Sequence, residues 1–102
     1  MRQLLTVQKR SKLNSVYAVD QPGNGGACHR FLIDANGEPV STEIQMQDGP
    51  RNLSDSKHGV IDSDLLEIVR DRLKSFQAGP YCCRENAIAL TYVEQALQWL
   101  NM

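Results

Sequence analysis

Residues 75–90 read Ser-Phe-Gln-Ala-Gly-Pro-Tyr-Cys-Cys-Arg-Glu-Asn-Ala-Ile-Ala-Leu, and Gly79-Pro80 interrupts two regions of helical periodicity. Proline lacks the backbone N–H that a helix needs, and glycine is costly inside a helix, so one helix ends here. The apolar side chains before the pair are Leu65, Leu66, Val69, Leu73 and Phe76. Those after it are Ala89, Leu90, Val93, Ala96, Leu97 and Leu100. This spacing predicts an antiparallel helical hairpin over residues 63–102.

Charged and capping residues support the start of the first helix. Asp62 or Ser63 is available as an N-cap, and Asp64 and Glu67 place negative charge in the first turn. Glu67 and Arg70 have the spacing of a helical ion pair. The second helix is expected from about residue 83 to residue 100.

The first half of the chain has a different periodicity. Its short apolar runs are residues 4–7, 16–19, 31–33 and 40–46, and the last alternates apolar and polar side chains. Asn36-Gly37 between the last two is a strong hairpin signal, because both residue types tolerate positive φ. The pattern predicts a β-meander of about four strands over 1–50 and a polar linker over 51–62. The expected fold class is α+β, an antiparallel sheet followed by the helical hairpin, in a single domain of residues 1–102.

Length and charge limit the function. The chain has 102 residues and a net charge of −1, and its basic and acidic side chains are balanced in both halves. This balance argues against a binder of nucleic acid polymers or of membrane surfaces. No apolar run approaches the ~18–20 residues of a membrane helix. A domain this small buries only roughly 60–65 % of its unfolded surface, so self-association is expected to help it.

The three cysteines are Cys28, Cys82 and Cys83, an odd number with two adjacent. Neighbouring cysteines rarely bridge each other, and no CxxC or HxxxH spacing suggests zinc. We expect reduced thiols in a cytosolic protein, no metal, and buried structural roles. A thiol enzyme that uses Cys82 or Cys83 near a helix N-terminus stays an alternative.

Several residues are candidates for binding. The glycine-rich segment 23–26 is either a backbone cradle for phosphate or a flexible strand connection, but it is no P-loop. Asn86 lies one heptad before Val93, on the apolar face. Its amide either bonds backbone near the turn or reads the edge of a planar ligand on which Phe76 stacks. Arg51 and Arg84 offer bidentate donors for phosphates.

The hairpin segment Gly79–Leu90, preceded by Asp71–Gln77, resembles the hairpin of a family of phage anti-defence proteins. Gly25–His29 and Gln47–Arg51 resemble the glycine-rich loop and linker of one branch, the first type of Thoeris anti-defence protein. That branch has a sheet before the hairpin. The related anti-CBASS cyclic-nucleotide sponges have the hairpin without this sheet.

The resemblance implies a sponge without cofactor or catalysis. Family members bind cyclic ADP-ribose isomers made by TIR-domain enzymes, such as glycocyclic ADP-ribose, in the cytoplasm of the infected bacterial host. They act as homodimers or trimers of dimers, with pockets between subunits. Some also hold cyclic di- or trinucleotides at a second site. A cyclic-oligonucleotide sponge and a ligand-free dimerisation module are the alternatives.

The resemblance also assigns roles. It implies that Phe76 stacks on adenine beside the Asn86 amide, and that Gly25 and Gly26 approach the ligand backbone. It associates Arg51 with the second, cyclic-nucleotide site. Two departures bear on these roles: Ala78 replaces a basic side chain of some relatives near the second site, and a basic tail that often holds the diphosphate does not follow Met102.

Overall fold

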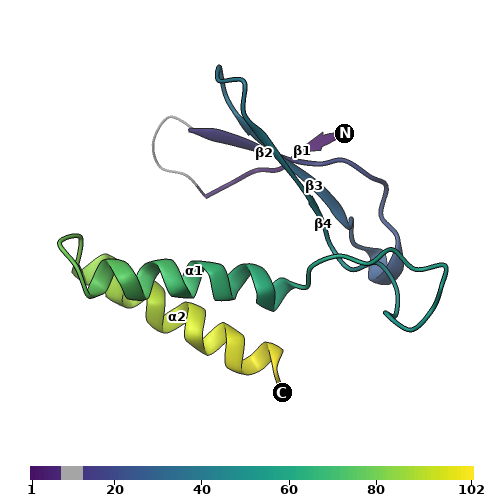
Figure 1. Cartoon of the computed structure of the whole chain (residues 1–102). Helices are drawn as coiled ribbons and strands as arrows, with labels where there is room; N and C mark the ends of the chain where they lie inside the picture. Colours follow the sequence, from purple (N-terminus) through teal and green to yellow (C-terminus); the bar gives the residue numbers. More distant parts are fainter. Residues whose placement is uncertain (8–12) are drawn as a thin grey trace. The chain divides into compact units, whose positions relative to one another are not determined.

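A computed structural model describes residues 1–7 and 13–102 as an antiparallel sheet followed by two helices that form a hairpin (Figure 1). The predicted α+β class is therefore confirmed. Contacts divide the chain into two compact units, residues 1–60 and residues 61–102. The first contains the sheet, and the second contains the hairpin.

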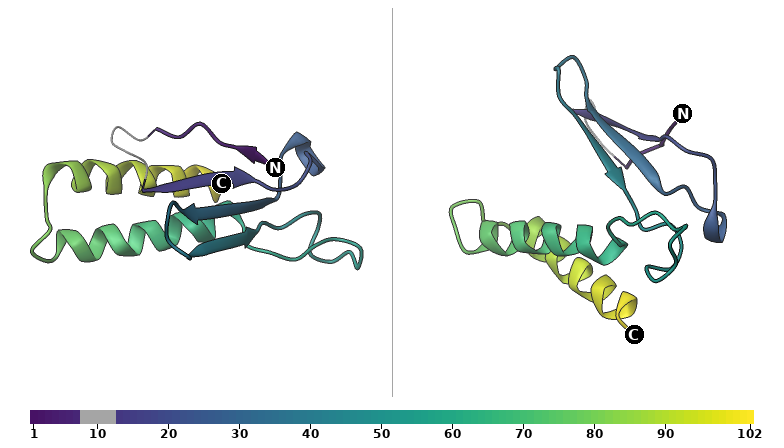
Figure 2. Two further views of the ribbon diagram at one scale, coloured as in Figure 1. Left: turned by 90° about the horizontal axis from the view of Figure 1, so that it is seen from above. Right: turned by 45° about the vertical axis from the view of Figure 1, so that its right-hand side comes forward.

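The sheet is a meander of four strands in the order of the sequence. The strands are β1 (Arg2–Gln3), β2 (Asn14–Ala18), β3 (Arg30–Ala35) and β4 (Ser41–Gln45). Each strand pairs antiparallel with its neighbour, and Figure 2 shows β2, β3 and β4 side by side. The four short apolar runs thus predicted the number and order of the strands, although not every boundary.

The prediction of a first strand at residues 4–7 was wrong. β1 pairs Arg2 and Gln3 with β2, and the Leu4 N–H still donates to the Val16 carbonyl at 2.8 Å. Beyond that bond, Leu5 and Val7 are 98 % and 100 % exposed. An apolar run favours a strand only where its side chains are buried. The side chains of Leu5 and Val7 are not buried, so they do not favour an extension of β1 through these residues.

The β3–β4 hairpin forms as predicted, but its turn differs. Only Gly37 takes positive φ, at 82°, whereas a two-residue turn of the expected type needs it at both positions. The connection is longer, because β4 begins at Ser41. The Asn36 side chain instead accepts a hydrogen bond of 2.9 Å from the buried Ser15 hydroxyl of β2. The side chain of Asn36, which signalled a tighter turn, therefore makes a tertiary contact instead.

Helix α1 (Asp62–Gln77) begins after Ile61, so the prediction of Asp62 or Ser63 as N-cap was wrong. An isoleucine side chain cannot accept a hydrogen bond, and the Asp64 carboxylate accepts the Ile61 N–H at 2.9 Å instead. Asp64, the third residue of the helix, thus accepts a hydrogen bond from the backbone N–H of the N-cap residue.

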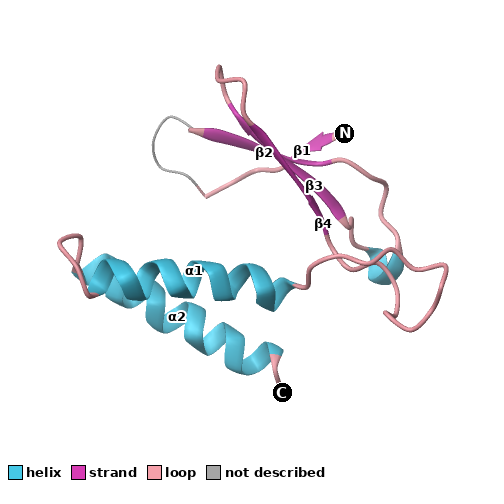
Figure 3. Cartoon of the chain, in the orientation of Figure 1, coloured by secondary structure: helices cyan, strands magenta, loops and turns pink. Residues whose placement is uncertain are grey.

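Helix α2 (Arg84–Leu100) begins after Cys83, whose Sγ accepts the Asn86 N–H at 3.4 Å. The Cys83 N–H donates to Gln77 Oε1 at 3.0 Å, which ties the end of α1 to the start of α2. The two helices pack against each other, with the short turn drawn between them in Figure 3. The hairpin predicted on either side of Gly79-Pro80 is confirmed.

The hairpin has a thin core. Leu97 is its one buried residue among those that the structure describes, whereas Tyr92 and Trp99 are 67 % and 78 % exposed. An ion pair of 2.9 Å joins Arg70 to Glu94 across the helices, and Arg70 also lies 3.6 Å from Glu67, the pair that the spacing predicted. Of the two helices described, neither is both long and apolar enough to cross a membrane.

Candidate ligand-binding site

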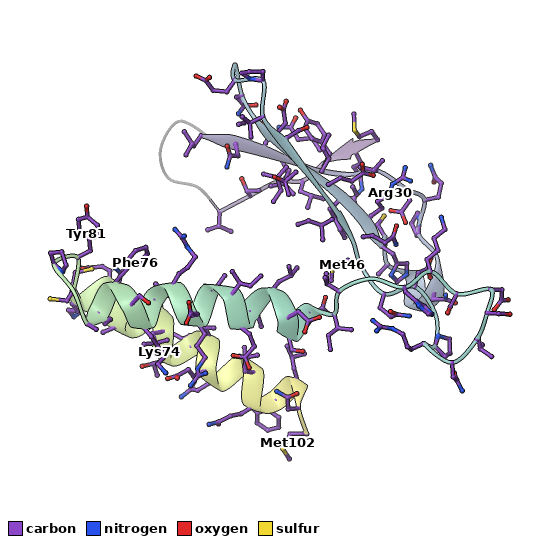
Figure 4. All side chains as sticks on the ribbon, viewed as in Figure 1. Arg30, Met46, Lys74, Phe76, Tyr81 and Met102 are labelled. Atoms are coloured by element: carbon purple, nitrogen blue, oxygen red, sulfur yellow. The ribbon has the colours of Figure 1, made fainter. Side chains whose placement is uncertain are left out.

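Phe76 and Asn86 lie at the turn of the hairpin and are linked through Tyr81. The rings of Phe76 and Tyr81 meet edge to face, with centroids 6.1 Å apart and an interplanar angle of 71°. The Asn86 Nδ2 donates to the Tyr81 carbonyl at 3.3 Å. This is the backbone bond that one of the two interpretations of Asn86 predicted. Figure 4 shows Phe76 and Tyr81 together at this end of the hairpin.

Two residues beside Phe76, namely Tyr81 and Arg72, were not predicted from the sequence. Tyr81 is 71 % exposed and extends the aromatic surface of Phe76 toward solvent. Arg72 places its guanidinium carbon 5.3 Å from the centroid of the Phe76 ring, within the range of a cation–π contact. The i,i+4 spacing of Arg72 and Phe76 on α1 was a signal that could have found this arginine. The result is a half-buried ring with a positive charge over it.

Arg84 occupies the first turn of α2 and is exposed. The positive end of the helix dipole surrounds it, so a cation here gains nothing from its own helix. In the part of the chain that the structure describes, no ion pair engages Arg84. Its guanidinium is available to an anion, and the phosphate contact stays a prediction.

Arg51 lies in the loop between β4 and α1, and the structure uses its side chain to close that loop. Its Nε donates to Gln47 Oε1 at 2.9 Å, and its Nη2 donates to the Gly59 carbonyl at 2.8 Å. The Arg51 carbonyl accepts from the His58 ring at 3.0 Å. A phosphate at Arg51 would compete with these bonds, and that role also stays a prediction.

Gly25 and Gly26 belong to a short 3-10 turn, η1 (Asn24–Gly26), between β2 and β3. Their φ angles are 73° and 79°, a region that favours glycine. Apart from each glycine and its two chain neighbours, no heavy atom of the described residues lies within 4 Å of where a Cβ would stand on either one. The segment, expected to be either a phosphate cradle or a flexible strand connection, therefore forms a short turn with open space beside both glycines.

The predicted site residues fall into two groups. Phe76, Arg84 and Asn86 lie in the unit of residues 61–102, and Gly25, Gly26 and Arg51 lie in the unit of residues 1–60. Phe76 and Asn86 lie together at the hairpin turn, whereas Gly25 and Gly26 belong to the other unit. A site that uses both groups stays a prediction.

Asp20 organises the C-terminal side of the glycine turn. Its carboxylate accepts the backbone N–H of His29 at 3.0 and 3.2 Å and that of Arg30 at 3.2 Å. The His29 N–H is the main cause that holds the pKa of the Asp20 carboxyl below its usual value, while burial opposes it. The Asp20 carbonyl also accepts a bond from the Cys28 thiol at 3.4 Å.

We expect the Asp20 carboxylate to make stability depend on acid pH. Because its pKa is lowered by folding, the contribution is fully present above the unfolded value of about 4 and is lost as pH falls through the lower folded value. Thermal unfolding followed from pH 5 to pH 2 tests this. The Asp20→Asn variant should lose stability less steeply than the parent chain over this range, and an equal slope would contradict the assignment.

All three cysteines carry free thiols, as expected. Cys28 is half-buried, but Cys82 and Cys83 are exposed, so the prediction of buried thiols was wrong for the adjacent pair. They lie in the turn and at the N-cap of α2, where little packs over them. Among the described residues, no three His, Cys, Asp or Glu side chains gather to hold a metal ion.

Each of the two units contains a hollow. One of about 410 Å³ lies within the hairpin and is lined by Glu67, Arg70, Glu94, Leu97, Gln98 and Asn101. The other, of about 250 Å³, adjoins the glycine turn and is lined by Asn24, Asp48, Gly49, Pro50, Leu53, Asp55, Ser56 and Lys57. Neither is apolar and enclosed, as typical drug-sized pockets are, and neither includes the aromatic pair.

Comparison with known proteins identifies the family. Residues 39–102 match the Acb2/Tad1 hairpin domain, so the match covers the whole hairpin and its turn. The chain is also 38 % identical over 80 residues to "Thoeris anti-defense 1" of Bacillus phage SBSphiJ7. That alignment covers 78 % of this chain and 54 % of the phage protein, so the chain spans about half the length of that relative. With more than half of its residues matched, the chain belongs to the Acb2/Tad1 hairpin-domain family.

Proposed function

We propose that this protein is an anti-defence sponge that binds a cyclic ADP-ribose isomer, such as glycocyclic ADP-ribose, and withholds it from the host's immune effector. The family match and the likeness to a Thoeris anti-defence protein support the biological role. The observation that carries the ligand class is the pairing of Phe76 with Asn86 through Tyr81 within the matched segment.

The residue chemistry suits an adenine nucleotide. An adenine has a flat face, which an aromatic ring binds by stacking, and a donor–acceptor edge, which an amide binds by hydrogen bonds. Phe76 supplies the face, and Asn86, whose Nδ2 bonds the Tyr81 carbonyl, supplies its amide oxygen. Arg84 supplies charge-assisted donors for a diphosphate, and the glycine turn permits close approach of backbone to ligand.

The ligand is bound intact. Both histidines direct Nε2 at backbone carbonyls, His29 at Asn24 and His58 at Arg51. Cys83 Sγ is engaged as the N-cap of α2. These contacts favour structural roles over that of a base or nucleophile. A sponge instead needs slow release, because sequestration depends on residence time.

The active form is a homo-oligomer, a dimer or a trimer of dimers, that acts in the cytoplasm of the infected bacterium. The thin core of the hairpin and the exposed side chains of Ile88, Tyr92 and Trp99 support association, because these three lie along one side of α2. Covering apolar surface of this kind is a common source of oligomer stability.

Native mass spectrometry of the protein incubated with glycocyclic ADP-ribose tests two proposals, that the ligand is bound intact and that the protein is a homo-oligomer. We expect an oligomer of the 11.4 kDa chain that carries the full mass of the ligand. Heating the complex should release unchanged ligand that again activates a TIR-system effector. Recovery of linear ADP-ribose would overturn sequestration without cleavage, and a monomer at micromolar concentration would overturn the oligomer. Binding of a cyclic trinucleotide in place of this ligand would favour the alternative sponge.

A further inference from the structure

Two loops that are distant in the sequence meet beside the glycine turn. The Asn24 Nδ2 donates to Asp48 Oδ1 at 2.7 Å, and the His29 Nε2 lies 3.7 Å from the same oxygen. The His29 Nε2 is also 2.9 Å from the Asn24 carbonyl. These three residues, called the Asp48 cluster below, join the β2–β3 connection to the loop after β4. Asn24 belongs to the glycine-rich segment 23–26, which the sequence offered as a candidate phosphate cradle, whereas His29 and Asp48 were not predicted as binding residues.

The partners of the cluster determine where its protons lie. The Asn24 carbonyl can only accept, so His29 Nε2 carries a hydrogen and donates it. Asp48 Oδ1 accepts from the Asn24 amide, as an ionised carboxylate does. The His29 and Asp48 side chains are 13 % and 26 % exposed, which limits competition from water. Asn24 is therefore held through both its side chain and its backbone.

This restraint acts on the residue directly before the two positive-φ glycines. Adjacent glycines have the largest conformational freedom in a chain, so one ordered conformation requires restraints from outside the pair. The backbone bond from Gly26 N–H to the Gly23 carbonyl, 2.9 Å, is a local restraint. The Asp48 cluster is the restraint that comes from another part of the chain.

We propose that Asp48 is a positioning residue that holds Asn24, and through it Gly25 and Gly26, in the conformation that receives the ligand. The role of the turn in binding rests on the proposed function. The positioning itself does not, because it concerns the order of the turn in the free protein. Preorganising a loop in this way improves affinity by removing the ordering cost of binding.

Exchanging the two side chains tests the proposal. Asn24→Asp places a second carboxylate against Asp48, so we expect amide hydrogen exchange at Gly26, whose N–H donates to the Gly23 carbonyl, to accelerate about tenfold or more. The affinity for glycocyclic ADP-ribose should fall by a similar factor. The double variant Asn24→Asp/Asp48→Asn restores one carboxylate and one amide with the donor direction reversed. It should return both quantities to within about threefold of the parent chain.

The control is Asp55→Asn, which removes a carboxylate of the same loop outside the cluster and should change neither quantity. Failure of the double variant to restore slow exchange would overturn the positioning role, because general destabilisation by Asn24→Asp predicts no rescue. Restored exchange in a protein that never binds the probe would confirm the positioning and overturn the proposed ligand. Restored exchange without restored affinity would overturn the link between the turn and binding.

Discussion

Replacing Phe76 and Asn86 together with alanine is expected to weaken binding of glycocyclic ADP-ribose by roughly 2–6 kcal/mol, about thirtyfold to beyond ten-thousandfold. Loss of base stacking accounts for roughly 1–3 kcal/mol and loss of buried amide hydrogen bonds for a similar amount. Isothermal titration calorimetry measures the affinity. The expected loss is large because both residues contact the same base in the proposed complex.

The same two residues also support the hairpin turn, so binding and folding must be measured on one sample. The Asn86 amide bonds the Tyr81 carbonyl, and Phe76 packs on the Tyr81 ring. Circular dichroism and light scattering show whether the double variant keeps its helices and its oligomeric state. The matched control is Phe76→Trp, which keeps an aromatic face and should bind within severalfold of the parent chain. A folded double variant that binds with unchanged affinity would remove both residues from the site.

Substituting Gly59 with alanine is expected to lower the free energy of unfolding by about 2–3 kcal/mol. A Cβ at Gly59 would overlap the Gln45 carbonyl oxygen and lie 2.7 Å from the Met46 carbonyl carbon. These neighbours are backbone atoms, so no change of rotamer relieves the overlap. The adjacent bonds from Val60 N–H to Gln45, 3.0 Å, and from Gln47 N–H to Val60, 2.7 Å, must lengthen instead.

Urea unfolding followed by circular dichroism measures this change. Gly79→Ala is the control, because a Cβ there would meet its nearest neighbour, the Ser75 carbonyl oxygen, at 3.4 Å. It should shift the free energy of unfolding by less than about 1 kcal/mol. A Gly59→Ala protein as stable as the parent chain would show that the segment after β4 can move away from Gln45 at little cost.

The helical hairpin could be predicted well because its determinants are local. Helical hydrogen bonds join residues four apart, so the apolar spacing and Gly79-Pro80 located both helices to within a residue or two. The cap of α1 was predicted less well. Asp64 satisfies the N–H of Ile61 from inside the helix, whereas the usual local pattern places a polar side chain at the N-cap.

The sheet was predicted less completely because strand pairing is not local. Four short apolar runs indicated four strands, but the bounds of β1 depend on which of its residues find partners on β2. The apolar character of Leu5 and Val7 therefore misplaced the strand. The bond between Ser15 and Asn36 likewise changed a turn that the local signal predicted to be tighter.

The sequence by itself determined the fold class and the helical hairpin, and it singled out Phe76 and Asn86 as candidate binding residues, since these follow from periodicity and from a continuous motif. The tertiary structure alone decided that Tyr81 connects the pair, that Arg51 closes its own loop, and that Asp48 meets Asn24 and His29. Asn24 and Asp48 lie 24 residues apart. No spacing rule relates two loop residues at such a separation, because the path of the intervening strands sets their distance.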